Sequence, residues 1–206
     1  NLAGLLKDLN CLDSAKESIL KAMTIHPKIA EYYFILAGIQ NSLGQLREAI
    51  ISLRKSIEIK PKYINSYSSL SALLRESGDL EEAKNIAQHA LELDSKNIST
   101  LVNYGLILQD IGHLKEAELY TKKAIEINPK HSLARCNLGG ILRDLGKLDE
   151  ARKSIEKAIE LEPELKIAYC NLAAILIDLG SLIEGEKILL KLIKLDKTII
   201  KSYFIL

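Results

Sequence analysis

Residues 137–146 read NLGGILRDLG, and the same frame recurs as NYGLILQDIG at 103–112, NLAAILIDLG at 171–180 and NLAGLLKDLN at 1–10. Glycine and proline follow the same spacing along the chain. The glycines that lie 34 residues apart are Gly44, Gly78, Gly112, Gly146 and Gly180. All four prolines, Pro27, Pro61, Pro129 and Pro163, lie on a second grid of that period. The chain is therefore an array of 34-residue repeats, and one repeat decides the fold.

One period, residues 132–165, contains two helical patterns. Apolar residues from Leu138 to Leu145 share one helical face, and Gly146 is predicted to end this first helix with a left-handed cap. A second helix follows and ends before Pro163, which cannot continue it. A single pair of helices cannot bury its apolar faces, whereas stacked pairs build a continuous core. The pattern predicts an all-α stack of antiparallel helix pairs.

The repeats resemble the tetratricopeptide repeat in four features: small residues in the first helix, Gly at the turn, two Ala columns in the second helix and Pro in the loop. The small residues are Ala37, Ser71, Gly105, Gly139 and Ala173. The resemblance implies one array over residues 1–206, folded as a right-handed superhelical α-solenoid. Its parts are a partial repeat at 1–29, full repeats at 30–63, 64–97, 98–131, 132–165 and 166–199, and the start of another at 200–206.

Two departures from the family pattern are visible. The large aromatic residue expected early in the first helix is present as Tyr33, Tyr67, Tyr169 and Tyr203, but Leu101 and Arg135 replace it in two repeats. We expect these two replacements to weaken local contacts. The last residues, IIKSYFIL at 199–206, are apolar where a finished array normally has a polar capping face. We therefore interpret the chain as a fragment of a longer protein.

Composition excludes several classes of function. The 28 Lys and Arg residues nearly balance the 27 Asp and Glu residues, so nucleic acid is not an expected partner. No apolar run is long enough to span a membrane. The three cysteines, Cys11, Cys136 and Cys170, lack a metal-binding spacing, and an odd number argues against a disulfide framework. A reducing, cytoplasmic location is favoured, and no catalytic residue, metal or cofactor is expected.

The recurring Asn and Asp form the candidate binding site. Seven helical residues turn the chain by about 700°, so each Asn lies within about 20° of its Asp and about 10.5 Å from it along the helix. The candidate residues are Asn103, Asn137, Asn171, Asp110, Asp144 and Asp178. A carboxamide offers a donor and an acceptor, as a peptide unit does. The Asn column is predicted to hold the backbone of an extended peptide, with the Asp column contacting its side chains.

Two structural alternatives stay open for the Asn column. These side chains could be ordinary solvated polar groups, or they could bond to the neighbouring repeat. Cys136 and Cys170, which precede two of the Asn residues, are interpreted as thiols at the edge of the groove.

The combination of Asn, small residues and Asp is similar to the repeat arm of O-GlcNAc transferase and of SPINDLY-type glycosyltransferases, and to bacterial repeat proteins with attached transferase domains. That resemblance implies that the first helices line a concave groove, in which Asn grips the substrate backbone. The pattern fails at Ile35 with Ser42 and at Ser69 with Glu76. The carboxylate clamp of other family members needs Lys before the Asn column. It is disfavoured, because the chain has Phe34, Ser68, Val102, Cys136 and Cys170 there.

Three functions follow from these observations. The first is a protein–protein interaction module that binds extended peptide segments in its groove. The second is the substrate-selecting arm of a larger glycosyltransferase or sulfotransferase. The third is a self-association module that pairs through its apolar ends. In each case the partner is a protein or an extended peptide, and the chain itself is not an enzyme.

Overall fold

The computed structural model describes residues 12–195, which form eleven α-helices and no strand. The first helices of the repeats are α3 (Ala30–Ser42), α5 (Ile64–Ser77), α7 (Ile98–Ile111), α9 (Ser132–Asp144) and α11 (Lys166–Asp178). The second helices are α2 (Leu12–Ile25), α4 (Leu46–Ile59), α6 (Leu80–Leu93), α8 (Leu114–Ile127), α10 (Leu148–Leu161) and α12 (Leu182–Leu195). The prediction of an all-α helical repeat solenoid is confirmed. The predicted start of the array at residues 1–11 and its apolar end at 199–206 lie outside the described residues.

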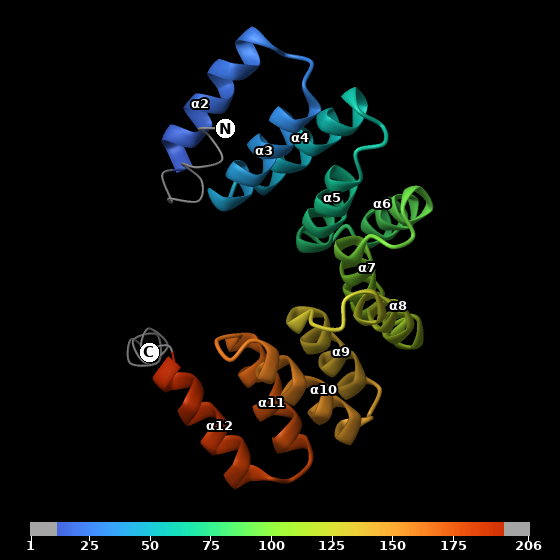
Figure 1. Ribbon diagram of the computed structural model, residues 1–206, viewed down its shortest axis with the longest axis vertical. Coiled ribbons are helices and arrows are strands. Elements are labelled where there is room, and N and C mark those ends of the chain that lie inside the picture. Colours follow the sequence, from blue (N-terminus) through green and yellow to red (C-terminus); the bar gives the residue numbers. More distant parts are fainter. Residues whose placement is uncertain (1–11, 196–206) are drawn as a thin grey trace. The chain divides into compact units, whose positions relative to one another are not determined.

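The chain divides into two compact units, Asn1–Ile107 and Leu108–Leu206, and the division falls within α7. In the N-terminal unit, α2, α3, α4, α5 and α6 pack side by side in chain order (Figure 1). In the C-terminal unit, α8 to α12 pack in the same way, and α9 also contacts α11. Within the C-terminal unit the first helices α9 and α11 are therefore neighbours, so a residue on α9 lies near its equivalent on α11.

The turn inside each repeat follows the glycine signal. Gly146 has a φ of 74°, in the left-handed region that favours glycine. Its N–H donates to Arg143 O at 2.9 Å, and the N–H of Lys147 donates to Leu142 O at 2.9 Å. This pair of bonds is a Schellman motif, which satisfies the last carbonyls of α9. The predicted left-handed cap is confirmed.

In three repeats a side chain near the start of the first helix bonds to the loop that precedes it. The hydroxyl of Tyr67 donates to Pro61 O at 3.0 Å, and that of Tyr169 donates to Pro163 O at 2.8 Å. Arg135 replaces this tyrosine, and its Nε and Nη2 both donate to Pro129 O, at 3.0 and 2.9 Å. The expectation that Arg135 weakens this contact is wrong, because the guanidinium group reaches the same carbonyl with two donors.

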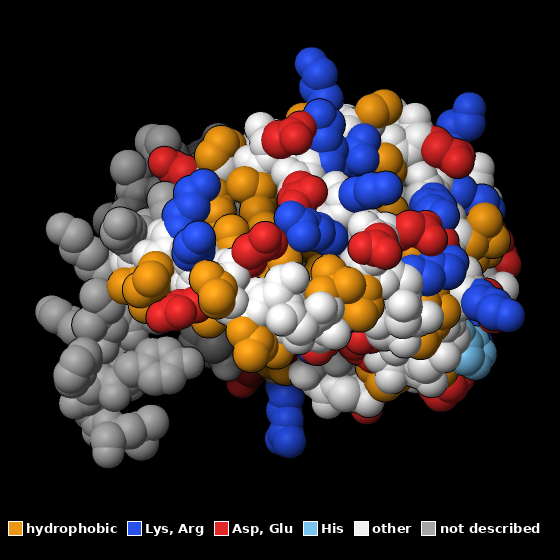
Figure 2. Space-filling view, turned by 90° about the horizontal axis from the view of Figure 1, so that it is seen from below, with side chains coloured by type: hydrophobic (Ala, Val, Ile, Leu, Met, Phe, Trp, Pro, Cys, Tyr) orange, Lys and Arg blue, Asp and Glu red, His pale blue; other side chains and the backbone are white. Residues whose placement is uncertain are grey.

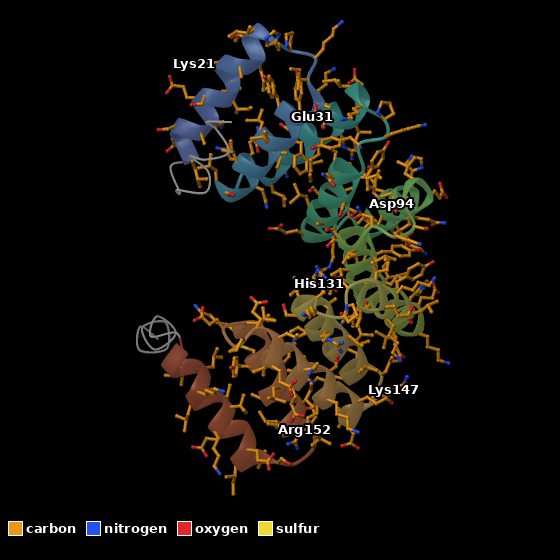
Figure 3. All side chains as sticks on the ribbon, in the orientation of Figure 1. Lys21, Glu31, Asp94, His131, Lys147 and Arg152 are labelled. Carbon is orange, nitrogen blue, oxygen red and sulfur yellow. The ribbon has the colours of Figure 1, made fainter. Side chains whose placement is uncertain are left out.

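The start of α9 has a second local support. His131 lies at its N-terminal end (Figure 3), and its Nδ1 accepts a hydrogen bond from the N–H of Ala134 at 3.1 Å. This bond satisfies one of the backbone donors that the first turn of a helix leaves without a partner. His131 is therefore the N-cap residue of α9.

Each unit has its own apolar core. In the C-terminal unit, Leu138, Leu142, Ile155, Leu172 and Leu176 form one buried cluster with several alanines. Cys136 belongs to the same cluster and is only 1% exposed. The interpretation of Cys136 as a thiol at the edge of a groove is therefore wrong, whereas Cys170 is exposed. In the N-terminal unit, a corresponding cluster joins α2 to α3 through Ala15, Ile19, Leu36 and Ile39.

The small-residue column of the first helices allows close packing against the second helices. At Gly139 an added Cβ would lie 2.3 Å from Ile155 Cδ1 and 2.4 Å from its Cγ1. Ile155 is fully buried, so it cannot move aside without disturbing the core. Gly185, by contrast, has room for a Cβ, since the nearest atom would be Ile177 Cγ1 at 3.4 Å.

These two glycines should respond in opposite ways to alanine. Gly185→Ala should raise the free energy of unfolding by about 0.5–1 kcal/mol, because alanine is the better helix former. Gly139→Ala should lower it by about 1 kcal/mol, because overpacking costs about 1–3 kcal/mol and exceeds the helical gain. Urea unfolding followed by circular dichroism measures both. In an Ile155→Ala background the Gly139→Ala step should become favourable; a persistent loss there would contradict this explanation.

Candidate functional site

The predicted Asn and Asp residues lie at one phase on α7, α9 and α11, with the Asn side chains partly buried and the Asp side chains exposed. Four residues before two of the Asn residues, Leu133 and Ile167 are 43% and 49% exposed. We call the line of four positions on each helix the first-helix stripe. It consists of Leu133, Asn137, Gly140 and Asp144 on α9, and of Ile167, Asn171, Ala174 and Asp178 on α11.

Two of the three Asn side chains bond to the preceding repeat. Asn103 Nδ2 donates to Ser68 O at 3.0 Å and lies 3.3 Å from Ser68 Oγ, within the N-terminal unit. Asn171 Nδ2 donates to Cys136 Sγ at 3.4 Å, within the C-terminal unit. In both cases the acceptor residue lies 35 positions earlier in the chain, on the preceding first helix. These two side chains therefore bond to the neighbouring repeat, which was one of the two alternatives to peptide binding. Both bonds use the amide nitrogen, and neither uses Oδ1.

Asn137 differs from the other two. Its Nδ2 is buried and has no hydrogen-bond partner among the described residues. A buried donor without a partner costs about 1–3 kcal/mol. Asn137 is therefore the member of the column that the fold supports least.

The Asp column also connects neighbouring repeats. Gln109 Nε2 donates to Asp144 Oδ2 at 2.6 Å, and Arg143 Nε donates to Asp178 Oδ2. The hydrogen bond from Arg143 lowers the pKa of Asp178 below its ordinary value. Exposed pairs of this kind stabilise a protein by only about 0–1 kcal/mol. One oxygen of each carboxylate is thus used inside the protein, and a ligand would meet the rest of the group.

A cavity that the Asn and Asp pattern does not indicate lies in the N-terminal unit, between α3, α4 and α5. It encloses about 480 Å³. Its residues are Phe34, Ile35, Ala37, Gly38, Asn41 and Ser42 on α3, Leu53 on α4, and Ser69, Ala72 and Leu73 on α5. The cavity therefore lies where the repeating pattern fails, at Ile35, Ser42 and Ser69. That failure was the sequence signal for it.

Phe34, which lines this cavity, is supported by contacts with residues outside the cavity. The rings of Phe34 and Tyr63 pack edge to face, with centroids 5.5 Å apart. Lys60 Nζ lies 4.8 Å from the centre of the Tyr63 ring and 2.6 Å from Glu31 Oε1. Their hydrogen bond raises the pKa of Lys60 and lowers the pKa of Glu31. Phe34 is thus held in place by a chain of contacts that joins the start of α3 to the loop before α5.

Metal-binding clusters, membrane-spanning helices and surface charge were also considered for the described residues. Within residues 12–195 no three His, Cys, Asp or Glu side chains lie close enough together to hold a metal ion. No helix in that part is long and apolar enough to cross a membrane. Figure 2 shows acidic and basic side chains interspersed over the viewed face rather than separated by sign. Glu118, which is buried, pairs with both Lys122 and Lys147 at 2.6 and 2.7 Å, and these two hydrogen bonds lower its pKa.

Comparisons with known proteins agree with the repeat pattern. A family model described as tetratricopeptide repeat matches residues 30–63, 64–97, 98–131, 133–165 and 167–199. No curated protein matches the chain significantly.

The fold is shared with many solved structures, of which three are described here. One is a thermophilic tetratricopeptide repeat protein of Thermus thermophilus, with a TM-score of 0.73 and 24% identity over 85% of this chain and 96% of that one. Another is a tetratricopeptide repeat protein of Parabacteroides merdae, with a TM-score of 0.76 and 25% identity over 93% and 76%. The third, YrrB, is described as having an unusual peptide-binding site. Its TM-score is 0.61, with 23% identity over 88% and 94%.

The contacts of the Asn column generate a ranked prediction. Asn103→Ala should lower the free energy of unfolding by about 0.5–1 kcal/mol. The hydrogen bond to Ser68 is lost, and the better helix propensity of alanine offsets only part of that loss. Asn171→Ala should lower it less, since its acceptor is a sulfur atom. Asn137→Ala should raise it, because a buried donor without a partner is removed. Urea unfolding of the three single variants checks the order; equal losses at all three positions would contradict it.

The two described cysteines should differ in reactivity. Burial raises the pKa of Cys136 to about 11, whereas a thiol in an unfolded chain titrates near about 8.5. In a Cys11→Ser background, a thiol reagent at mildly alkaline pH should modify Cys170 rapidly and Cys136 only after unfolding.

The stability of the fold should also depend on the protonation of Cys136. The neutral Cys136 thiol stabilises the fold fully below about pH 8.5, and this contribution should be lost as pH rises through about 11. Cys136→Ala should remove that part of the alkaline loss, and an unchanged profile would count against the assignment.

Proposed function

We propose that this chain, which belongs to the tetratricopeptide repeat family, binds an extended segment of a partner protein across the first-helix stripe. Repeats of this family are consistent with protein–protein interaction. The observation that carries the finer proposal is the stripe itself. On α9 and on α11 the same order of side chains recurs: an exposed apolar residue, an Asn, a small residue and an exposed Asp. These two helices are in contact, so a single peptide can cross both.

The spacing of the helices suits an extended peptide. Packed helices lie about 8–10 Å apart, and an extended chain advances about 3.3 Å per residue. Each first helix therefore meets roughly every third residue of the peptide. A hydrogen bond contributes about 0.5–1.5 kcal/mol net, so a few such contacts give weak binding that tolerates different sequences. Leu133 and Ile167 add apolar contact at one end of the stripe.

The inter-repeat bonds refine the role of the Asn residues. Because Nδ2 of Asn171 donates to Cys136, the group that it presents to a ligand is Oδ1, an acceptor. The carboxylates of Asp144 and Asp178 are acceptors as well. The stripe therefore favours donors: peptide N–H groups, hydroxyl groups and basic side chains. The description of YrrB as a protein with a peptide-binding site supports a peptide as the ligand. The resemblance to the glycosyltransferase arm stays a prediction.

Blocking the stripe tests the proposal. Gly140 and Ala174 occupy its centre, and a Cβ added at Gly140 would lie 3.7 Å from its nearest neighbour, Gln109 Nε2. Peptides would be selected from a random library on the unaltered protein. Their dissociation constants would then be measured for Gly140→Leu, Ala174→Leu and the matched control Lys153→Leu, which lies at an exposed position of α10.

Each of the two blocked variants should bind the selected peptides about tenfold more weakly, because the bulky side chain removes one or two contacts. The control should bind them as before. Circular dichroism must show an unchanged helix content in all three variants. Unchanged binding by both blocked variants would overturn the assignment of the stripe as the binding surface.

A further inference from the structure

Two positions on the outer face of α12 are apolar where the other full repeats have polar residues. Ile183 is 72% exposed and Leu190 is 51% exposed. In each of the four preceding full repeats, the two equivalent positions carry a charged residue or Gln. These residues are Arg47, Glu81, Lys115 and Asp149 at the position of Ile183, and Arg54, Gln88, Lys122 and Glu156 at the position of Leu190. The repeat pattern therefore assigns this face to solvent, and α12 departs from the pattern.

Stacking of a further repeat does not account for these two apolar residues. On α10, which has α11 packed against it, Asp149 stays exposed and the side chain of Glu156 is 44% exposed. Leu189 is different, because its equivalent Ile155 is fully buried in the core that α10 shares with α11. The next helix of an array would therefore cover Leu189, whereas Ile183 and Leu190 lie on a face that a stacked repeat leaves open.

The two apolar residues enclose one charge of each sign. Ile183 and Leu190 are seven residues apart, so they lie within about 20° of one line along α12 and about 10.5 Å from each other. Glu186 and Lys187 lie between them, and both are exposed. At about 100° per residue, Glu186 falls about 50° to one side of that line and Lys187 about 50° to the other. We call these four residues the α12 outer face.

The α12 outer face is complementary to a second copy of itself. When two copies of α12 run side by side in the same direction about a two-fold axis, Ile183 meets its own equivalent, and so does Leu190. The Glu186 carboxylate of one copy then faces the Lys187 ammonium of the other, on both flanks of the contact. An antiparallel pair would instead place each charge beside its own equivalent, and like charges oppose association. Charge complementarity therefore selects the parallel pair.

We propose that this chain forms a weak symmetric dimer through the α12 outer face, with the two helices parallel. The dimer goes beyond the proposed function, because the first-helix stripe lies on other helices and peptide binding does not require it. A contact made by one helix from each copy is a small interface, so association should be transient and should depend on concentration. Apolar contact between the Ile183 and Leu190 pairs favours association, and the two ion pairs fix the direction of the helices.

Sedimentation equilibrium of the whole chain, from about 1 µM to about 1 mM, tests the dimer. The unaltered chain should change from monomer to dimer within that range. Ile183→Asp combined with Leu190→Glu gives α12 the residues that α10 has at these positions, so circular dichroism should be unchanged and the dimer should be lost. Leu119→Lys is the matched control. Leu119 is 51% exposed on α8, and its equivalents in the next two repeats are Lys153 and Lys187. This variant should associate as the unaltered chain does.

Charge variants at exposed positions test the direction of the helices. Glu186→Lys and Lys187→Glu should each weaken the dimer about tenfold, because both ion pairs become contacts between like charges. The double variant restores opposite charges across the contact and should associate as the unaltered chain does.

Three results would overturn the proposal. The first is a chain that stays monomeric at every concentration. The second is a dimer that survives the combined Ile183→Asp and Leu190→Glu change, because association would then use another surface. The third is single charge variants that associate as tightly as the unaltered chain, which is the result expected of an antiparallel pair.

Discussion

The close approach of a first helix to its second helix is the constraint on which the rest of the structure depends. At Gly139 the absence of a side chain lets Ile155 reach the backbone of α9, and the buried Ile155 then contributes to the core that α9, α10 and α11 share. Alanine, serine and glycine hold the same phase in the other first helices. The two helices of a repeat pack closely against each other, and their remaining apolar faces contact the next repeat. The repeats therefore build a shared core.

Stacking also decides what the polar residues do. Two Asn and two Asp side chains of the first helices each bond to the residue 35 positions earlier. Asn103 finds Ser68, Asn171 finds Cys136, Asp144 finds Gln109 and Asp178 finds Arg143. These side chains therefore serve both the repeat stack and, in the proposed function, the ligand. The two roles are compatible because the bonds use the amide nitrogen and one carboxylate oxygen, leaving other acceptors of the same groups.

The N-terminal unit shows how the same scaffold gives a different surface. Between α3 and α5 the residues of the stripe are Ile35 and Ser42 on one helix and Ser69 on the other. Here a cavity lies between the helices, lined by apolar side chains and by Asn41, Ser42 and Ser69. Phe34, which lines the cavity, packs against Tyr63, and Tyr63 in turn contacts Lys60, which pairs with Glu31. These contacts hold the Phe34 ring in place. Substitutions at single positions of the repeat therefore change the chemistry of the surface, while the arrangement of the helices is the same in each repeat.

The repeat length, the helix ends and the helical fold class could all be predicted from the sequence alone. Those features depend on local properties that each residue carries with it: a glycine that accepts a positive φ, a proline that cannot donate a backbone hydrogen bond, and apolar residues at helical phase. The sequence also indicated the Asn and Asp positions, because their recurrence is visible without coordinates. Only the tertiary structure decided what those side chains contact, that Cys136 is buried, that Arg135 replaces a tyrosine contact, and that a cavity lies between α3 and α5. The physical reason is that a hydrogen-bond partner or an empty volume belongs to several helices at once, and depends on residues some 35 positions apart that local patterns do not connect.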